Sequence, residues 1–246
     1  MHTPTPAQLL QVWERGGELS ATSRSLLLLG SSCEEGTAGN LAALSLGARD
    51  ELLLQLRERL FGVDIEVVAN CPKCAAPVEA SFRCTDLHLV ADTDDTLTVP
   101  ERVLSVDGQR VPFRLPDSND LLALEGCADP GAARQLLVER CLLAGDASAE
   151  GGARTWLPSL QNELAQAMAR ADPQADLQLD LRCPECAHDW QPAFDIARFL
   201  WQELHAWALH MLREVDTLAQ AYHWAEADIL GLSPRRRQAY LELCVP

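Results

Sequence analysis

The chain has 246 residues, of which 48% are apolar, enough for one large domain or two small ones with buried cores. Its formal net charge of −16 argues against nucleic acid as a partner, because Lys and Arg side chains supply most of that affinity. No apolar run approaches the length of about 20 residues that is needed to span a membrane. The apolar segment at residues 23–30 is too short for a signal peptide, and its flanking residues are wrong for one. We therefore expect a protein that is cytoplasmic, or is assembled in the cytoplasm, and that binds no membrane.

The N-terminal quarter of the chain predicts helices at residues 6–15, 20–29 and about 46–60, from the spacing of their apolar residues. Ser20 is a suitable N-cap for the second helix and Ser45 for the third, since a serine oxygen accepts a hydrogen bond from the first turn. A glycine follows the last turn of the third helix and is expected to end it.

The middle of the chain predicts a small β insert over residues 85–116, because apolar and polar residues alternate there. Its second part predicts a hairpin with Asp107 and Gly108 in the turn. Two helices are then expected, at 116–126 and 129–145. Their expected limits are an N-cap at Ser118 or Asn119 for the first and an end at Gly145 for the second.

A cysteine turn occurs twice, 112 residues apart, in DIEVVANCPKC (64–74) and DLQLDLRCPEC (176–186). Residues 49–63 and 161–175 precede the two copies, and an alternating segment follows each. The repeated unit is therefore helix, strand, Cys-Pro-x-Cys turn, strand. Equivalent positions are Cys71 and Cys183, Pro72 and Pro184, Cys74 and Cys186, and Phe82 and Phe194.

Each Cys-x-x-Cys turn presents two thiolates on one side and so supplies half of a tetrahedral metal site. Two such turns supply the four ligands of a closed structural zinc site. We therefore predict one shared zinc ion bound by Cys71, Cys74, Cys183 and Cys186. The long intervening segment is no obstacle, because the entropy of closing a loop grows only logarithmically with its length.

Three other interpretations of the cysteines stay open. A CPxC turn is also found in thiol oxidoreductases, although there it opens a helix rather than a strand. Disulfides are disfavoured by the odd number of cysteines, nine, and by the lack of a secretory signal. Two separate metal sites would use Cys84 in one and His188 in the other. The remaining cysteines, expected to be core thiols, are Cys33, Cys127, Cys141 and Cys244.

The last fifty residues predict a long amphipathic helix over 196–222, followed by two short helices. Within the long helix, Trp201, Trp207 and Met211 form a candidate surface for a protein partner, because aromatic and Met side chains are enriched at interfaces. A further candidate is the cluster at the start of the last helix, Arg235, Arg236 and Arg237, which suits an acidic protein surface. A helix-turn-helix that binds DNA is the alternative, and the overall acidity argues against it.

No catalytic motif is recognisable, including GxSxG, P-loop, HExxH and Gly-rich dinucleotide turns. A catalytic zinc ion needs an open coordination position, and four cysteines leave none. We therefore expect a protein that is not an enzyme.

One group of residues resembles the T4-type baseplate proteins of contractile-tailed phages: Gly47, Arg49, Asp50, the leucines that follow, Gly62 and the turn Cys71-Pro72-x-Cys74. Residues 221–241 also look like the C-terminal segments of tail assembly proteins. The chain departs from the familiar pattern at Ala75 and Ala187, where a glycine usually follows the knuckle and tolerates a positive φ more readily. The resemblance implies a hub component or hub assembly chaperone of a phage tail or a phage-like contractile injection system.

The prediction as a whole is an α+β, mostly α fold, in which two helix–strand–knuckle–strand units share a zinc-ribbon-like core. The predicted function is that of a non-enzymatic baseplate component or assembly chaperone that binds hub subunits and resides in the cytoplasm or in a virion-like particle. A zinc-ribbon DNA-binding regulator and a CxxC thiol oxidoreductase are the alternatives, and the sequence does not indicate the oligomeric state. The expected segments are 1–84, 85–116, 117–195 and 196–246, the last carrying the helical arm.

Overall fold

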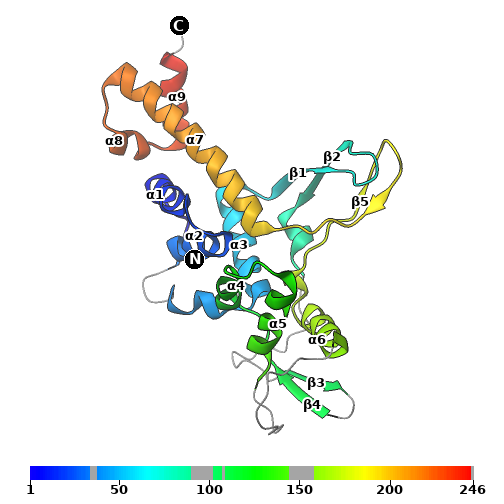
Figure 1. Cartoon of the computed structure of the whole chain (residues 1–246). Helices are drawn as coiled ribbons and strands as arrows, with labels where there is room; N and C mark the ends of the chain where they lie inside the picture. The colour runs from blue at the N-terminus through cyan, green and yellow to red at the C-terminus, as the bar shows by residue number, and fades with distance from the viewer. Residues whose placement is uncertain (34–37, 90–101, 107–108, 144–157, 245–246) are drawn as a thin grey trace. The chain divides into compact units, whose positions relative to one another are not determined.

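The computed structural model of the chain is mostly helical with small antiparallel sheets, which confirms the predicted α+β class (Figure 1). It divides into a terminal unit, Met1–Ala38 with Ile196–Pro246, and a central unit, Gly39–Asp195. Each unit is described by itself, and the four segments expected from the sequence stay a prediction. The structure describes residues 1–33, 38–89, 102–106, 109–143 and 158–244.

The terminal unit is built on one long helix, α7 (Ile196–Tyr222), whose bounds are those predicted. The other helices of this unit pack along it (Figure 1). The buried residues of α7 recur every three or four positions, as the apolar pattern of the sequence predicted. They are Ile196, Ala197, Leu200, Leu204, Ala208, Met211, Val215 and Leu218. The packed helices are α1 (Pro6–Gly16), α2 (Ala21–Ser32), α8 (Glu226–Leu230) and α9 (Pro234–Cys244).

In the terminal unit, the starts of α1, α2 and α9 are capped by side chains. Thr5 and Gln8 form a reciprocal capping box at α1, and Ser20 accepts the backbone N–H of Ser23 at α2, as predicted. Ser233 accepts the N–H of Arg236 at the start of α9. Within the described part of the chain, no helix combines the length and apolar character that crossing a bilayer requires.

The central unit contains α3 (Leu46–Phe61), which begins after Ser45 and ends at Gly62 with a φ of 93°. A glycine is required there, because this left-handed conformation is costly for other residues. The described residues of the unit form three two-stranded antiparallel sheets. Its further elements are β1 (Asp64–Asn70), β2 (Pro77–Arg83), β3 (Arg102–Val106), β4 (Gln109–Phe113), α4 (Ser118–Leu124), α5 (Pro130–Cys141), α6 (Pro158–Ala171), β5 (Leu181–Arg182) and β6 (Asp189–Trp190), with short 3₁₀ turns at Ala38–Ala43, Cys84–Leu87 and Pro173–Ala175.

Two of the predicted helix limits were wrong. The N-cap of α4 is Asp117, whose carboxylate accepts the N–H of Asp120, and not Ser118 or Asn119. Helix α5 ends at Cys141, before the predicted Gly145, because the chain then pairs with strand β4. The pairing uses a bridge between Phe113 and Leu142 and backbone hydrogen bonds on both sides of it. The hairpin of β3 and β4 forms as predicted, while its turn at Asp107 and Gly108 lies outside the described residues.

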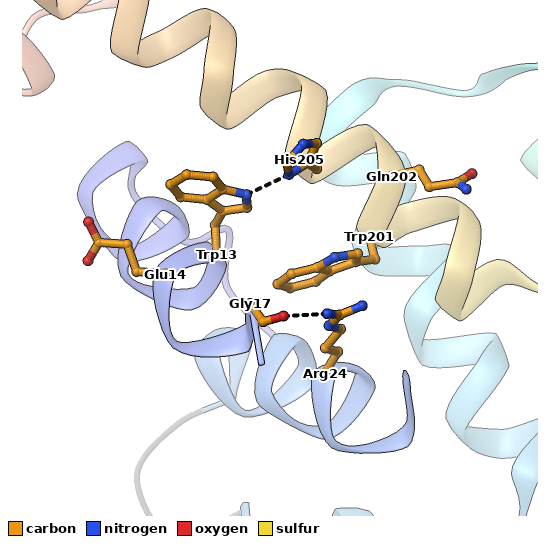
Figure 2. Close-up of a pocket in the computed structure, with 7 residues that line it drawn as sticks. All are labelled: Trp13, Glu14, Gly17, Arg24, Trp201, Gln202 and His205. Carbon is orange, nitrogen blue, oxygen red and sulfur yellow. Dashed lines mark hydrogen bonds between the residues drawn. The ribbon is translucent and has the colours of Figure 1, made fainter. Parts of the chain in front are cut away.

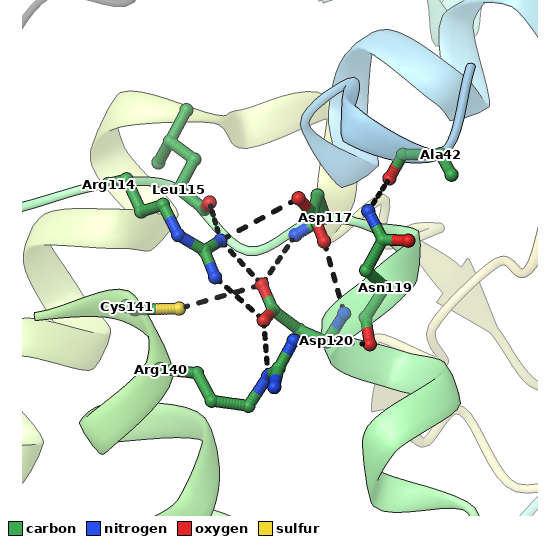
Figure 3. Close-up of polar contacts among 8 residues, drawn as sticks. All are labelled: Ala42, Arg114, Leu115, Asp117, Asn119, Asp120, Arg140 and Cys141. Carbon is green, nitrogen blue, oxygen red and sulfur yellow. Dashed lines mark hydrogen bonds and ion pairs between the residues drawn. The ribbon is translucent and has the colours of Figure 1, made fainter. Parts of the chain in front are cut away.

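An ion cluster around the buried Asp120 joins the end of β4 to α4 and α5 (Figure 3). Asp120 is fully buried and accepts hydrogen bonds from Arg114 at 2.6 and 2.8 Å and from Arg140 at 2.7 Å. The N–H of Asp117 adds another at 2.9 Å. Burial would raise the pKa of the Asp120 carboxyl, but these donors outweigh it and lower the pKa to about 2.

The start of α3 is held by a second buried polar group. The N–H of Gly47 donates to the carboxylate of Asp172 at 2.9 Å, and a Cβ at position 47 would collide with that carboxylate. In the same turn, Arg49 is buried and forms an ion pair with Asp50 at 2.7 Å. Burial raises the pKa of Asp50 to about 6, with Arg49 acting against the shift and Asp195 and Asp172 adding to it. The glycine of the predicted baseplate pattern therefore has a packing reason.

Candidate metal centre

The two cysteine turns have the same backbone geometry. In the first, β1 and β2 are paired from Asp64 opposite Arg83 to Asn70 opposite Pro77, which places the turn at the end of the ribbon. In the second, paired residues are fewer, and β5 and β6 form only two pairs. The matching hydrogen bonds are Ala75 N–H to Cys71 carbonyl at 2.8 Å, Ala187 N–H to Cys183 carbonyl at 2.9 Å, Cys71 N–H to Ala76 carbonyl at 2.9 Å and Cys183 N–H to His188 carbonyl at 2.9 Å.

Both turns close through a residue in the left-handed conformation. Ala75 has a φ of 61° and Ala187 a φ of 55°. These are the two positions at which the sequence has alanine in place of an expected glycine, and the alanines adopt the left-handed conformation that glycine tolerates more readily. Such a conformation costs an L-residue about 1 kcal/mol or more. Both turns keep it, and in each the same alanine N–H donates to the carbonyl of the first cysteine, which closes the turn.

The turns bring four thiols from the two ends of the central unit into one cluster. The Sγ atoms of Cys71, Cys74, Cys183 and Cys186 all lie within 4.8 Å of one another. Between the two turns, the Sγ atoms of Cys71 and Cys186 are 3.7 Å apart and those of Cys74 and Cys183 are 3.6 Å apart. A tetrahedron of zinc–sulfur bonds of about 2.3 Å places its sulfur atoms about 3.8 Å apart, so the donor set and its spacing fit zinc. All four are free cysteines, without disulfides.

The electrostatics of the thiols also fit a cation. Burial opposes the ionisation of Cys71, but hydrogen bonds from the backbone of Cys74 and Lys73 and from the Cys186 side chain outweigh it and lower the pKa to about 7. At Cys74 the Ala76 backbone lowers the pKa, while burial and the neighbouring thiols raise it to about 12. In the absence of a cation the cluster therefore favours one thiolate over several. A bound cation would replace the thiol protons and allow all four to ionise.

The cluster is enclosed by protein on one side. Cys71 is 2% exposed and Cys183 is 1% exposed, and they pack with Val78 and, more loosely, with Trp190. Cys74 is exposed and Cys186 is half-buried. Farther along the strands, the rings of Phe82 and Phe194 meet edge to face at 5.6 Å. Four protein ligands leave no coordination position for a substrate, so the arrangement suits a structural ion.

A family model described as T4 bacteriophage base plate protein matches residues 27–201, which is well over half of the chain. The chain belongs to this family. The matched region contains α3, both cysteine turns and the first residues of α7, so the predicted resemblance is confirmed. Neither the curated proteins nor the solved structures contain a match to the chain. The resemblance of the C-terminal segment lies outside the matched residues and stays a prediction.

The other two candidate ligands, Cys84 and His188, are not among the residues of the metal-site cluster. Cys84 is fully buried beside Arg57, whose Nη1 donates to its Sγ at 3.6 Å. The ring of His188 stacks on Trp190, with 6.2 Å between the ring centroids. Among the described residues, the four clustered cysteines are the one group with the spacing of a metal site. Of the expected core thiols, Cys141 is buried, and Cys33, Cys127 and Cys244 are half-buried.

The candidate partner residues of the base plate protein are divided between surface and interior. Met211 is 2% exposed and Arg237 is 5% exposed, so both are used within the terminal unit, where Arg237 pairs with Glu214 at 2.5 Å. Trp201 and Trp207 are half-buried. Arg235 and Arg236 are exposed at the start of α9.

The sequence did not predict which residues surround Trp201. The structure places Trp13 and Arg24 beside it, and Trp13 donates to His205, which is 192 positions away in the sequence (Figure 2). The amphipathic pattern of α1 predicts a helix that buries one face, but no signal in it indicates which side chains of α7 it meets.

Proposed function

We propose that this protein is a non-enzymatic structural component of a phage baseplate or of a related contractile injection system, and that it acts by binding other baseplate proteins. The observation that carries the proposal is the base plate family match over residues 27–201. The matched segment includes the four-cysteine cluster but ends near the start of α7. The central unit is therefore the part that we assign to the shared family role, and the rest of α7 with α8 and α9 to partner choice.

The proposed cofactor is one structural zinc ion bound by the four cysteines. It is supported by sulfur separations of 3.6 and 3.7 Å and by the closed ligand set. We further propose that the two knuckles are copies of one unit that meet in a zinc-ribbon-like core. The support is the offset of 112 residues, the matching turn hydrogen bonds and the helices α3 and α6 at equivalent positions. In such a core the energy of metal binding contributes to folding.

The proposed partner surface lies on the terminal unit. Trp201 and Trp207 are half-buried, and the exposed leucines Leu209 and Leu212 lie on the same helix. Arg235 and Arg236 would pair with acidic groups of a partner, while Met211 and Arg237 support the surface from within. Exposed apolar side chains beside exposed cations are typical of a protein–protein interface.

A test is to purify assembled particles from cells that produce them and to detect this chain by immunoblot or mass spectrometry, with assembly intermediates analysed in parallel. A baseplate component is expected in finished particles at a fixed ratio to other baseplate proteins. Presence in intermediates alone would assign the assembly chaperone role instead. Absence from both fractions would contradict the proposal.

The lowered pKa of Cys71 favours one other function, thiol oxidoreduction. That function requires metal-free protein to reduce a disulfide substrate through Cys71, and zinc to inhibit it. The structural proposal predicts no such activity in either form, which an insulin reduction assay can measure.

A further inference from the structure

The four-cysteine cluster is open to solvent at one of its thiols. The chain has nine cysteines, all of them among the residues that the structure describes, and Cys74 is the only exposed one. Cys71 and Cys183 are 2% and 1% exposed, and Cys186 is half-buried. Because the oxidation of a cysteine depends on its exposure and its thiolate character, a reagent in solution meets the cluster first at Cys74.

Apolar packing covers the other three thiols of the cluster. They belong to a group of buried and half-buried residues from both cysteine turns and the strands beside them. The members of this group are Cys71, Ala76, Val78, Cys183, Cys186 and Trp190. One ligand of the proposed ion is therefore open to solvent, and the other three are wholly or partly covered by protein.

The two turns also differ in charge at the residue before their outer cysteine. Lys73 precedes Cys74 in the first turn, whereas Glu185 precedes Cys186 in the second, and both residues are exposed. When a thiolate reacts with a peroxide, negative charge develops on the hydroxide that leaves. The ammonium of Lys73 stabilises this charge beside Cys74, and the carboxylate of Glu185 opposes it beside Cys186. Exposure and charge therefore select the same thiol.

The opposite turn holds a thiol that can react with an oxidised Cys74. The Sγ atom of Cys183 lies 3.6 Å from that of Cys74. A disulfide bond of about 2.05 Å requires these two sulfur atoms to approach by about 1.6 Å. Since Cys183 is buried, it is protected from an oxidant in solution but not from its neighbour in the cluster.

We propose that Cys74 is an oxidation site, at which a peroxide converts the four-cysteine cluster into a disulfide form that releases its ion. The inference rests on the proposed zinc site and names the thiol through which that site is opened. The zinc content of the central unit then depends on the concentration of oxidant around it.

The oxidation takes place in two steps. The thiolate of Cys74 attacks one oxygen atom of hydrogen peroxide, so that an S–O bond forms, the O–O bond breaks and hydroxide leaves. The thiolate of Cys183 then attacks the sulfur atom of Cys74, so that an S–S bond forms, the S–O bond breaks and a second hydroxide leaves. The two sulfur atoms together lose two electrons and the peroxide gains them, and each hydroxide takes a proton from solvent. Two thiolates remain, too few for a closed site, while the disulfide keeps the two turns joined.

The test is treatment of the full-length, zinc-loaded protein with hydrogen peroxide. Dimedone traps sulfenic acids in one sample, and peptide mass spectrometry measures the adduct at each cysteine. The initial adduct at Cys74 should exceed that at Cys186 about fivefold or more. Without dimedone, we expect a disulfide between Cys74 and Cys183 and, measured with a zinc-binding dye, release of about one zinc ion per oxidised chain. Dithiothreitol and added zinc should restore the starting state.

The residues before the outer cysteines offer matched variants that leave all four ligands in place. Lys73→Glu should slow zinc release by peroxide about threefold or more, because it places a negative charge beside the reacting thiolate. Lys73→Arg keeps the positive charge and should react as the wild type does. Glu185→Lys should increase the dimedone adduct at Cys186 about threefold. Zinc content before oxidation should be the same in all three variants, since both residues are exposed.

A first adduct at Cys186, or equal adducts at Cys74 and Cys186, would overturn the inference. So would a disulfide between Cys71 and Cys74 within one turn, or oxidation of Cys74 that leaves the zinc bound. Zinc-loaded protein that gives any of these results refutes this inference alone, because the proposed metal site is still present. Protein that is purified without zinc contradicts the proposed site and this inference with it, and neither result affects the particle analysis.

Discussion

The Asp120 cluster allows a quantitative test of the central unit. The carboxylate is fully buried and accepts from Arg114, Arg140 and the Asp117 backbone (Figure 3). Its pKa of about 2, against an ordinary 3.8, corresponds to about 2 kcal/mol of stability at neutral pH. Breaking a buried ion pair by removing one partner costs about 3–5 kcal/mol. Asp120→Asn should therefore lower the free energy of unfolding by about 2–5 kcal/mol at pH 7.

The sign of the pH dependence follows from the lowered pKa of Asp120. The stabilisation is present above about pH 4 and is lost as the pH falls through about 2. The difference between wild type and Asp120→Asn should therefore be largest at pH 7 and shrink toward pH 2. Urea unfolding followed by circular dichroism measures this difference in the free energy of unfolding at each pH. The contributions of the other titrating groups cancel, because the two proteins share them.

A matched control for Asp120 is Asp189, an exposed carboxylate 3.8 Å from the exposed Arg182. Asp189→Asn should change the free energy of unfolding by less than about 0.5 kcal/mol, because solvent screens such a pair. A loss below about 1 kcal/mol for Asp120→Asn at pH 7, or a loss that does not vary with pH, would refute the reasoning about the buried cluster.

Three further predictions concern the central unit. Burial raises the pKa of Asp50 to about 6 against the opposing effect of Arg49, so the protonated carboxyl stabilises the fold below about pH 4 and this stabilisation is lost as the pH rises through 6. In urea unfolding, the free energy of unfolding of Asp50→Asn should therefore rise by about 3 kcal/mol relative to that of the wild type between pH 4 and pH 7. A difference that is constant with pH would contradict this. Replacing Ala75 and Ala187 by glycine should each stabilise the zinc-loaded protein by about 1 kcal/mol in thermal unfolding, and a lowered melting temperature would show that the left-handed turns are not strained. Gly47→Ala should destabilise by about 2 kcal/mol, since the Cβ displaces the Asp172 carboxylate, and wild-type stability of this variant would refute the packing argument.

The sequence predicted the features that depend on local pattern. The stripe of apolar residues gave both ends of α7, at Ile196 and Tyr222, because period and length are properties of the helix itself. The repeat spacing predicted that the turns of Cys71 and Cys183 meet, since half-sites of one ion have to come together.

Features that depend on partners distant in the sequence were not predicted. Asp120 was assigned to a helix start, but its pairing with Arg140 requires the packing of α4 on α5. Helix α5 was expected to continue to Gly145, and it stops at Cys141 because β4 offers backbone hydrogen bonds to the residues that follow. The pairing of Trp13 with His205 likewise depends on how α1 meets α7. Such contacts follow from tertiary packing, which overrides the local preference of a segment.

The most direct test of the account is the metal content of the purified protein. Elemental analysis of protein prepared without added metal should give one zinc per chain in the wild type and in the control Cys244→Ser, whose thiol lies outside the cluster. Cys71→Ser and Cys183→Ser should each lose the zinc and much of the stability of the central unit, because each knuckle contributes half of the site. Protein that is folded and free of metal, or two zinc ions per chain, would contradict the shared four-cysteine site.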